Sequence, residues 1–100
     1  MPDFCVTAVQ YNGEHSHIEK LKVRRELVVD GKVQLGPVRI VPRAFVADLI
    51  NSGKVTFITR VKGGDNLMYK GADIHVIENE FLSTDRNSRT RDNLENLPEF

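Results

Sequence analysis

The chain has 100 residues, of which 40% are hydrophobic and 28% are charged, and its formal net charge at pH 7 is zero. This length is that of one domain with a single core, and the composition excludes a wholly disordered chain. The single cysteine, Cys5, excludes an intrachain disulfide and is typical of a reducing compartment. No apolar run approaches the roughly 18 residues that cross a bilayer, and the first residues lack the features of a secretory signal. We expect one cytoplasmic domain over residues 1–100, with no membrane partner.

The first predicted strand spans residues 4–11, because apolar side chains alternate there with a period of two. Its alternation places Phe4, Val6 and Ala8 on one face and Cys5, Thr7, Val9 and Tyr11 on the other. Asn12 and Gly13 then predict a turn, since both residues tolerate a positive φ.

A second strand is expected from His17 onward. Its apolar face carries Leu21, Val23 and Leu27, and its opposite face carries Lys20, Lys22 and Arg24. Ile18 falls on the basic face, so either a bulge near Glu19 resets the register or the pairing begins later.

Asp30-Gly31 is the clearest hairpin signal, because a two-residue type I′ turn needs a positive φ at both positions. The only helix is expected at about residues 42–52. Pro42 suits its first position and Gly53 the site just past its end. Four apolar residues share one face at helical spacing: Phe45, Val46, Leu49 and Ile50.

The remaining strands are expected at residues 55–61, 72–77 and 81–84, with turns at 62–66 and 78–80. Strands outnumber helices without the alternation of parallel α/β folds. The predicted fold class is therefore α+β: an antiparallel sheet of about five strands, with helix 42–52 packed on it. Residues 85–100 are expected to form a C-terminal loop and an anchor turn docked alongside.

The anchor turn is predicted from four residues near the C-terminus: Asp92, Leu94, Leu97 and Pro98. Asp92 has the spacing of a helix N-cap with Glu95, and Pro98 stops the turn. The two leucines point the same way. They are expected to close the core, and the alternative is a motif displayed to a partner.

The chain resembles the domain-of-unknown-function 3892 family of small bacterial and phage-associated proteins. The matching pieces are His17-Ile18, Ser52-Gly53, the 55–57 strand, and above all residues 81–84 followed by residues 92–98. The resemblance covers most of the chain except roughly residues 21–40, which we interpret as a hairpin insertion. It implies a compact α+β domain and carries no established activity.

One candidate site is a nucleic-acid or anion-binding face made of five basic residues on neighbouring strands: Lys20, Lys22, Arg24, Arg60 and Lys62. Alternate residues of a strand lie about 7 Å apart, near the spacing of successive phosphates. Tyr11 and Tyr69 are the available stacking partners. Residues 1–77 hold 11 Lys/Arg against 8 Asp/Glu, giving +3, and residues 78–100 hold 3 against 6, giving −3. A solvated polar face explains the stripe equally well.

The other chemically suggestive residues predict structure rather than catalysis. His15 and His17 form an H-x-H pair, but zinc needs three or four ligands, so no metal or cofactor is expected. Cys5 lies mid-strand among apolar residues and is expected to be buried. The first functional hypothesis is a non-enzymatic binding or accessory module whose partner is unknown, either a protein or a nucleic acid. The alternatives are a nucleic-acid-associated protein and a small enzyme, which no positioned acid/base pair supports.

Overall fold

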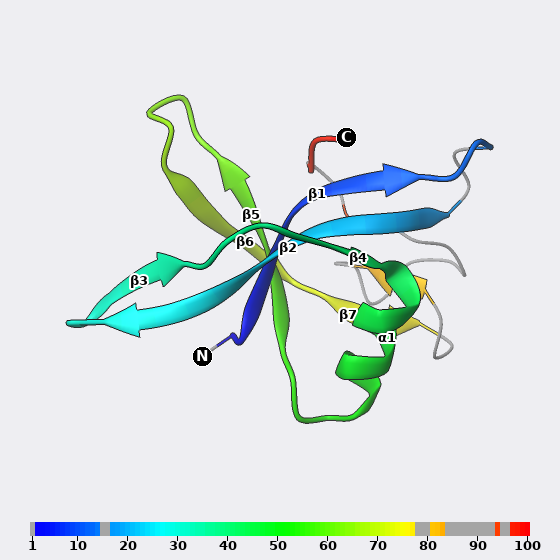
Figure 1. Cartoon of the computed structure of the whole chain (residues 1–100), viewed down its shortest axis with the longest axis horizontal. Helices are drawn as coiled ribbons and strands as arrows, with labels where there is room; N and C mark the ends of the chain where they lie inside the picture. The colour runs from blue at the N-terminus through cyan, green and yellow to red at the C-terminus, as the bar shows by residue number, and fades with distance from the viewer. Residues whose placement is uncertain (1, 15–16, 78–80, 84–93, 95–96) are drawn as a thin grey trace.

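The computed structural model describes residues 2–14, 17–77, 81–83, 94 and 97–100. Eight strands and one helix follow one another in these residues (Figure 1): β1 (Phe4–Tyr11), β2 (Ile18–Val29), β3 (Lys32–Leu35), β4 (Arg39–Pro42), α1 (Arg43–Asn51), β5 (Phe57–Lys62), β6 (Met68–Asp73), β7 (His75–Ile77) and β8 (Phe81–Ser83). The predicted α+β class is confirmed. No helix in this part of the chain is long and apolar enough to cross a membrane.

The main sheet has six strands in the order β3-β2-β1-β5-β6, with β4 pairing with β2 beside β3. It is mixed, so the prediction of a purely antiparallel sheet was wrong at one place: β1 and β5 run parallel. Parallel neighbours need a long crossover, and here β2, β3, β4 and α1 supply it. The missed element is β4, since no strand was predicted between the Asp30-Gly31 hairpin and the helix.

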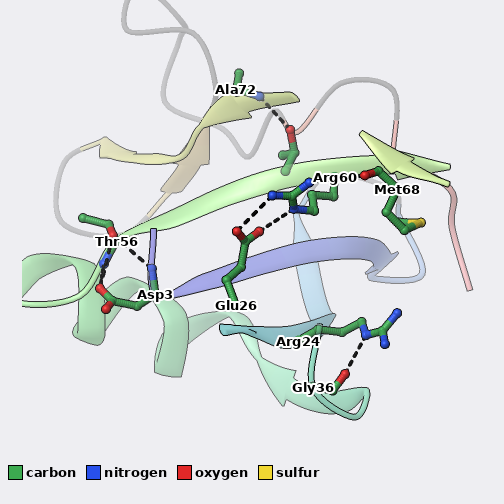
Figure 2. Close-up of polar contacts among 9 residues, drawn as sticks. Asp3, Arg24, Glu26, Gly36, Thr56, Arg60, Met68 and Ala72 are labelled. Atoms are coloured by element: carbon green, nitrogen blue, oxygen red, sulfur yellow. Dashed lines mark hydrogen bonds and ion pairs between the residues drawn. The ribbon is translucent and has the colours of Figure 1, made fainter. Parts of the chain in front are cut away.

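Asp3 and Thr56, which lie just before β1 and β5, are joined by hydrogen bonds at the start of this parallel pair of strands (Figure 2). The Asp3 carboxylate accepts hydrogen bonds from the Thr56 amide at 2.9 Å and the Thr56 hydroxyl at 3.1 Å, and the Asp3 amide donates to the Thr56 carbonyl at 3.1 Å. These bonds satisfy backbone groups that lie just before both strands. They set β5 beside β1 in the register that joins Cys5 to Ile58.

Two bulges decide which side chains reach the core. The register between β1 and β2 shifts between Val6 and Ala8, so Val9 joins Val6 in the core. The prediction that Val6 and Val9 lie on opposite faces was therefore wrong, because a β-bulge reverses the alternation. A second shift pairs Gln10 with Lys20 and Tyr11 with Ile18, which agrees with the first of the two alternatives, a bulge near Glu19, and not with a later start of the pairing.

The β2–β3 hairpin turns at Asp30 and Gly31, whose φ values are 52° and 77°. Both lie in the left-handed region that a type I′ turn requires, so this prediction is confirmed. After β3 the chain crosses to β4, which pairs with the first half of β2 from Lys20 to Val23. Residues 21–40 thus contain most of β2, all of β3 and the start of β4. Their interpretation as an insertion stays a prediction.

Helix α1 is one residue shorter at each end than the predicted range. Pro42 is extended, with φ −70° and ψ 152°, and serves as the N-cap instead of the first helical residue. Gly53 has a φ of 75°, as expected for the residue just past a helix end. The buried face consists of Val46 and Ala47, whereas Phe45 is 51% exposed. The prediction that all four apolar residues point inward was wrong for Phe45.

The strands after β5 also differ from the prediction. The expected strand at residues 72–77 is two strands: β6, which begins earlier at Met68, and β7, which pairs with β8 in a separate two-stranded sheet. Gly71 allows β6 to approach β5 closely, because a methyl group there would lie 2.2 Å from the Thr59 hydroxyl. The same hydroxyl accepts a hydrogen bond from the Ala72 amide at 3.0 Å.

The core lies between one face of the sheet and a layer formed by α1 and the β7–β8 hairpin (Figure 1). It combines side chains from all these elements with one from the C-terminal segment: Val6, Val9, Ile18, Leu21, Val23, Val46, Ala47, Phe57, Ile74, Leu82 and Leu94. Leu94 is 2% exposed, Leu97 packs half-buried against the core, and Pro98 is exposed. Asp92 and the rest of the predicted turn lie outside the described residues. Glu99 pairs with Val9 of β1.

Candidate functional site

The five basic residues predicted from the sequence lie on the sheet face opposite α1. Cys5 pairs with Arg24 on one side and with Ile58 on the other, so Arg24 and Ile58 share its face. Lys20 and Lys22 follow from Arg24 by strand alternation, and Arg60 and Lys62 follow from Ile58. The mixed sheet therefore brings two basic stripes onto one face, the basic face.

A carboxylate interrupts this face. Glu26 is 6% exposed, and it accepts hydrogen bonds from Arg60 Nε at 2.5 Å and from Arg60 Nη2 at 3.0 Å (Figure 2). Arg60 also donates through Nη1 to the Met68 carbonyl at 3.2 Å. The hydrogen bond to Glu26 raises the pKa of Arg60 above its ordinary value. The bidentate pair satisfies Glu26 inside the fold, so most of the Arg60 charge is neutralised before any partner arrives.

Two further cations of the basic face make contacts within the fold. Arg24 donates through Nε to the Gly36 carbonyl at 2.7 Å (Figure 2). It also donates through Nη2 to the Leu35 carbonyl at 3.2 Å. Lys22 Nζ lies 4.7 Å from the centroid of the Phe100 ring, a cation–π contact. Only Lys20 and Lys62 are exposed and without such a contact among the described residues.

Cys5 lies beneath this network and is fully buried. Burial, followed by the neighbouring Glu26 carboxylate, raises the pKa of the Cys5 thiol from 9.0 to about 11. A reactive cysteine needs the opposite: an electropositive, partly open site that lowers the pKa. The thiol is therefore protonated at neutral pH and packs as a small apolar side chain.

A cleft of about 500 Å³ opens between the β2–β3 and β5–β6 hairpins, and we name it the arginine cleft after Arg24 and Arg60 in its lining. Tyr69 also lines it and is 51% exposed. The ring lies so close to Gly63 that a methyl group there would be 2.6 Å from Cε2. The Tyr69 hydroxyl donates to Asp65, which lowers the pKa of Asp65 and raises the pKa of Tyr69. The hydrogen bond to Asp65 thus fixes the Tyr69 ring in the lining of a cleft to which Arg24 and Arg60 also contribute.

A second hollow, which we name the apolar groove, lies on the other face of the sheet along α1. Its volume is about 380 Å³. Its floor includes Phe4 and Phe57, whose rings stack with centroids 5.2 Å apart. Val41 of β4 and Phe45 and Leu49 of α1 form one wall. An exposed aromatic residue beside an unfilled apolar hollow is the usual sign of a surface that another molecule covers.

Charge at the apolar groove has one sign. Its lining includes Arg25 and Arg39, both exposed, and no aspartate or glutamate among the described residues. No hydrogen bond or ion pair of either guanidinium lies within the described part of the chain. Sequence reasoning missed this site, because Phe45 matched the helical apolar period and was counted as core. Four apolar residues in a helix of nine residues are the usual number for one buried stripe, so no signal in the sequence set Phe45 apart.

The other residues considered from the sequence form no site in the described residues. His17 is half-buried, and His15 lies outside the described ranges, so the pair stays untested. Among the residues described, no three of the types His, Cys, Asp and Glu are grouped in a way that would hold a metal ion.

Comparison with known proteins identifies a family but no function. The family model described as "Protein of unknown function (DUF3892)" matches residues 5–98. The match spans the β2–β3 region as well as the strands and helix around it. No curated protein and no solved structure matches the chain.

Proposed function

The chain belongs to the DUF3892 family of proteins of unknown function, and we propose that it is a non-enzymatic module that binds an apolar segment of a partner protein in the apolar groove. The observation that carries this proposal is the half-exposed Phe45 at the edge of an unfilled, almost wholly apolar hollow. Burying such a ring in an interface contributes more than most contacts, because large aromatic anchors dominate binding energy.

Binding is favoured over catalysis by the environment of the buried Cys5 thiol and the buried Glu26 carboxylate. The Cys5 thiol is buried and its pKa is raised, so it lacks the thiolate that attacks substrates. Glu26, the buried carboxylate beside it, is already paired with Arg60 at both oxygens. A general base must lie within hydrogen-bond reach of a substrate proton, and Glu26 is buried. Neither group supports a reaction.

The test is a selection of random-sequence displayed peptides on the immobilised protein. Selected peptides are expected to bind Phe45→Asp at least about tenfold more weakly than wild type, as for an anchor residue. Ala44→Asp is the matched control, since Ala44 is the preceding exposed helix residue and does not line the groove. Failure to select any peptide, or equal binding to both variants, would contradict the proposal.

A second candidate function, nucleic-acid binding, is favoured by one observation: the sheet register brings Lys20, Arg24, Arg60 and Lys62 onto one face. Its test is a titration with short single-stranded DNA and RNA at two salt concentrations. Binding should weaken at high salt, and Lys20→Glu with Lys62→Glu should weaken it further. Absence of binding at low salt would rule this candidate out.

A further inference from the structure

We infer that the partner segment is extended and acidic, and that it adds as a strand to the open edge of β4 while placing an apolar side chain in the apolar groove. This inference rests on the proposed function and names the chemistry of its ligand. Three features of the groove lead to it: a strand edge that pairs with no described strand, two cations without a counter-charge among the described residues, and a hollow of limited size.

The first feature is the edge of β4. Among the described strands, β4 pairs only with β2, so the backbone groups of Arg39 to Pro42 on its other side meet no strand. Exposed edges of this kind accept extended peptides through main-chain hydrogen bonds. Pro42 has no N–H and limits the pairing to the residues before it. Side chains of an added strand alternate between faces, so every second one lies on the face of Arg39 and Val41.

The second feature is charge. Arg25 and Arg39 are both exposed at the apolar groove, and its described lining holds no acidic residue to balance them. A segment with a basic residue beside its apolar anchor would face repulsion there. One with aspartate or glutamate would gain charge-assisted hydrogen bonds. Charge complementarity therefore selects acidic residues next to the anchor.

The third feature is size. A groove of about 380 Å³ lies near the lower end of the range for small-ligand pockets, about 300–1,000 Å³. It has room for an apolar side chain but not for a helix, whose diameter with side chains is about 10–12 Å. An extended segment can insert one such side chain into the groove while its backbone stays outside. Specificity then comes from the groove and affinity from the strand edge, as in other strand additions.

The closing experiment is to sequence the selected peptides and measure their affinity at two salt concentrations. Wild type should enrich sequences with an apolar residue flanked by Asp or Glu. The double variant Arg25→Glu with Arg39→Glu should bind these peptides about tenfold more weakly. Peptides selected on the double variant should instead carry Lys or Arg next to the apolar residue. Lys32→Glu with Lys54→Glu, at two exposed lysines outside the groove lining, is the control for the same change of net charge.

The outcomes separate the two claims. Peptides that depend on Phe45 but show no acidic preference would overturn this inference and leave the proposed function standing. Acid-flanked peptides that bind the double variant as tightly as wild type would likewise overturn the inference alone. Peptides that bind independently of Phe45 would overturn both. Enrichment of amphipathic helical sequences would contradict the claim that the partner segment binds as an extended strand.

Discussion

At the scale of single residues, the polar interior depends on Glu26. Its side chain is 1% exposed, and the side chain of Arg60, which is 14% exposed, donates a hydrogen bond to each of its two carboxylate oxygens. A buried ion pair is not in itself strong evidence of stability, because desolvation offsets the attraction. Removing one partner is different, since the other charge is then left in the interior.

Arg60→Met is therefore expected to lower the free energy of unfolding by about 3–5 kcal/mol, because it leaves the buried Glu26 carboxylate without its ion-pair partner. Lys62→Met is the matched control, two residues along the same strand and exposed, and should change stability by less than about 0.5 kcal/mol. Urea denaturation followed by circular dichroism measures both. Similar losses in the two variants would show that Glu26 does not depend on Arg60.

Cys5 predicts a pH dependence. Its thiol pKa is raised from 9.0 to about 11 in the folded protein, so folding disfavours the thiolate. The associated stability is fully present below pH 9.0 and is lost as the pH rises toward 11. Cys5→Ala should remove this part of the alkaline decline, while lysine and tyrosine titrations remain common to both proteins. Urea denaturation on either side of pH 9.0 tests this, and parallel pH profiles would contradict it.

At the scale of elements, the sequence predicted local features well and pairings between distant segments poorly. The Asp30-Gly31 turn was predictable and the bulge near Glu19 was one of two alternatives, because both follow from neighbouring residues. The parallel pairing of β1 with β5 was not, since it depends on where a long crossover returns the chain. The Glu26–Arg60 pair depends on that pairing, because its two partners are 34 positions apart in the sequence.

The C-terminal segment gives a prediction at this scale. Leu94 is 2% exposed inside the core, so Leu94→Ala is expected to cost about 2–5 kcal/mol of stability. Leu97→Ala should cost less, because Leu97 is half-buried. Pro98→Ala is the control: Pro98 is exposed, and the hydrogen bond from Val9 reaches only its backbone carbonyl, at 3.0 Å. Chemical denaturation would contradict this if all three variants matched wild type.

At the scale of the whole molecule, the sheet presents two unlike surfaces. The basic face carries the five cations predicted from the sequence, of which Lys22, Arg24 and Arg60 already make contacts within the fold. The apolar groove lies across the sheet beside α1. The basic residues could be found from strand alternation alone. The groove could not, because it depends on how α1 crosses the sheet and leaves Phe45 half exposed.

The most direct measurement is a map of backbone amide NMR shifts during titration with a selected peptide. The central claim is that the partner binds between β4 and α1, so the largest shifts should fall at Val41, Phe45 and Leu49. Amides near Arg60 and Tyr69, which line the arginine cleft, should move little. Largest shifts around Arg60 and Tyr69, with Phe45 unmoved, would contradict the claim and move the binding site to the basic face.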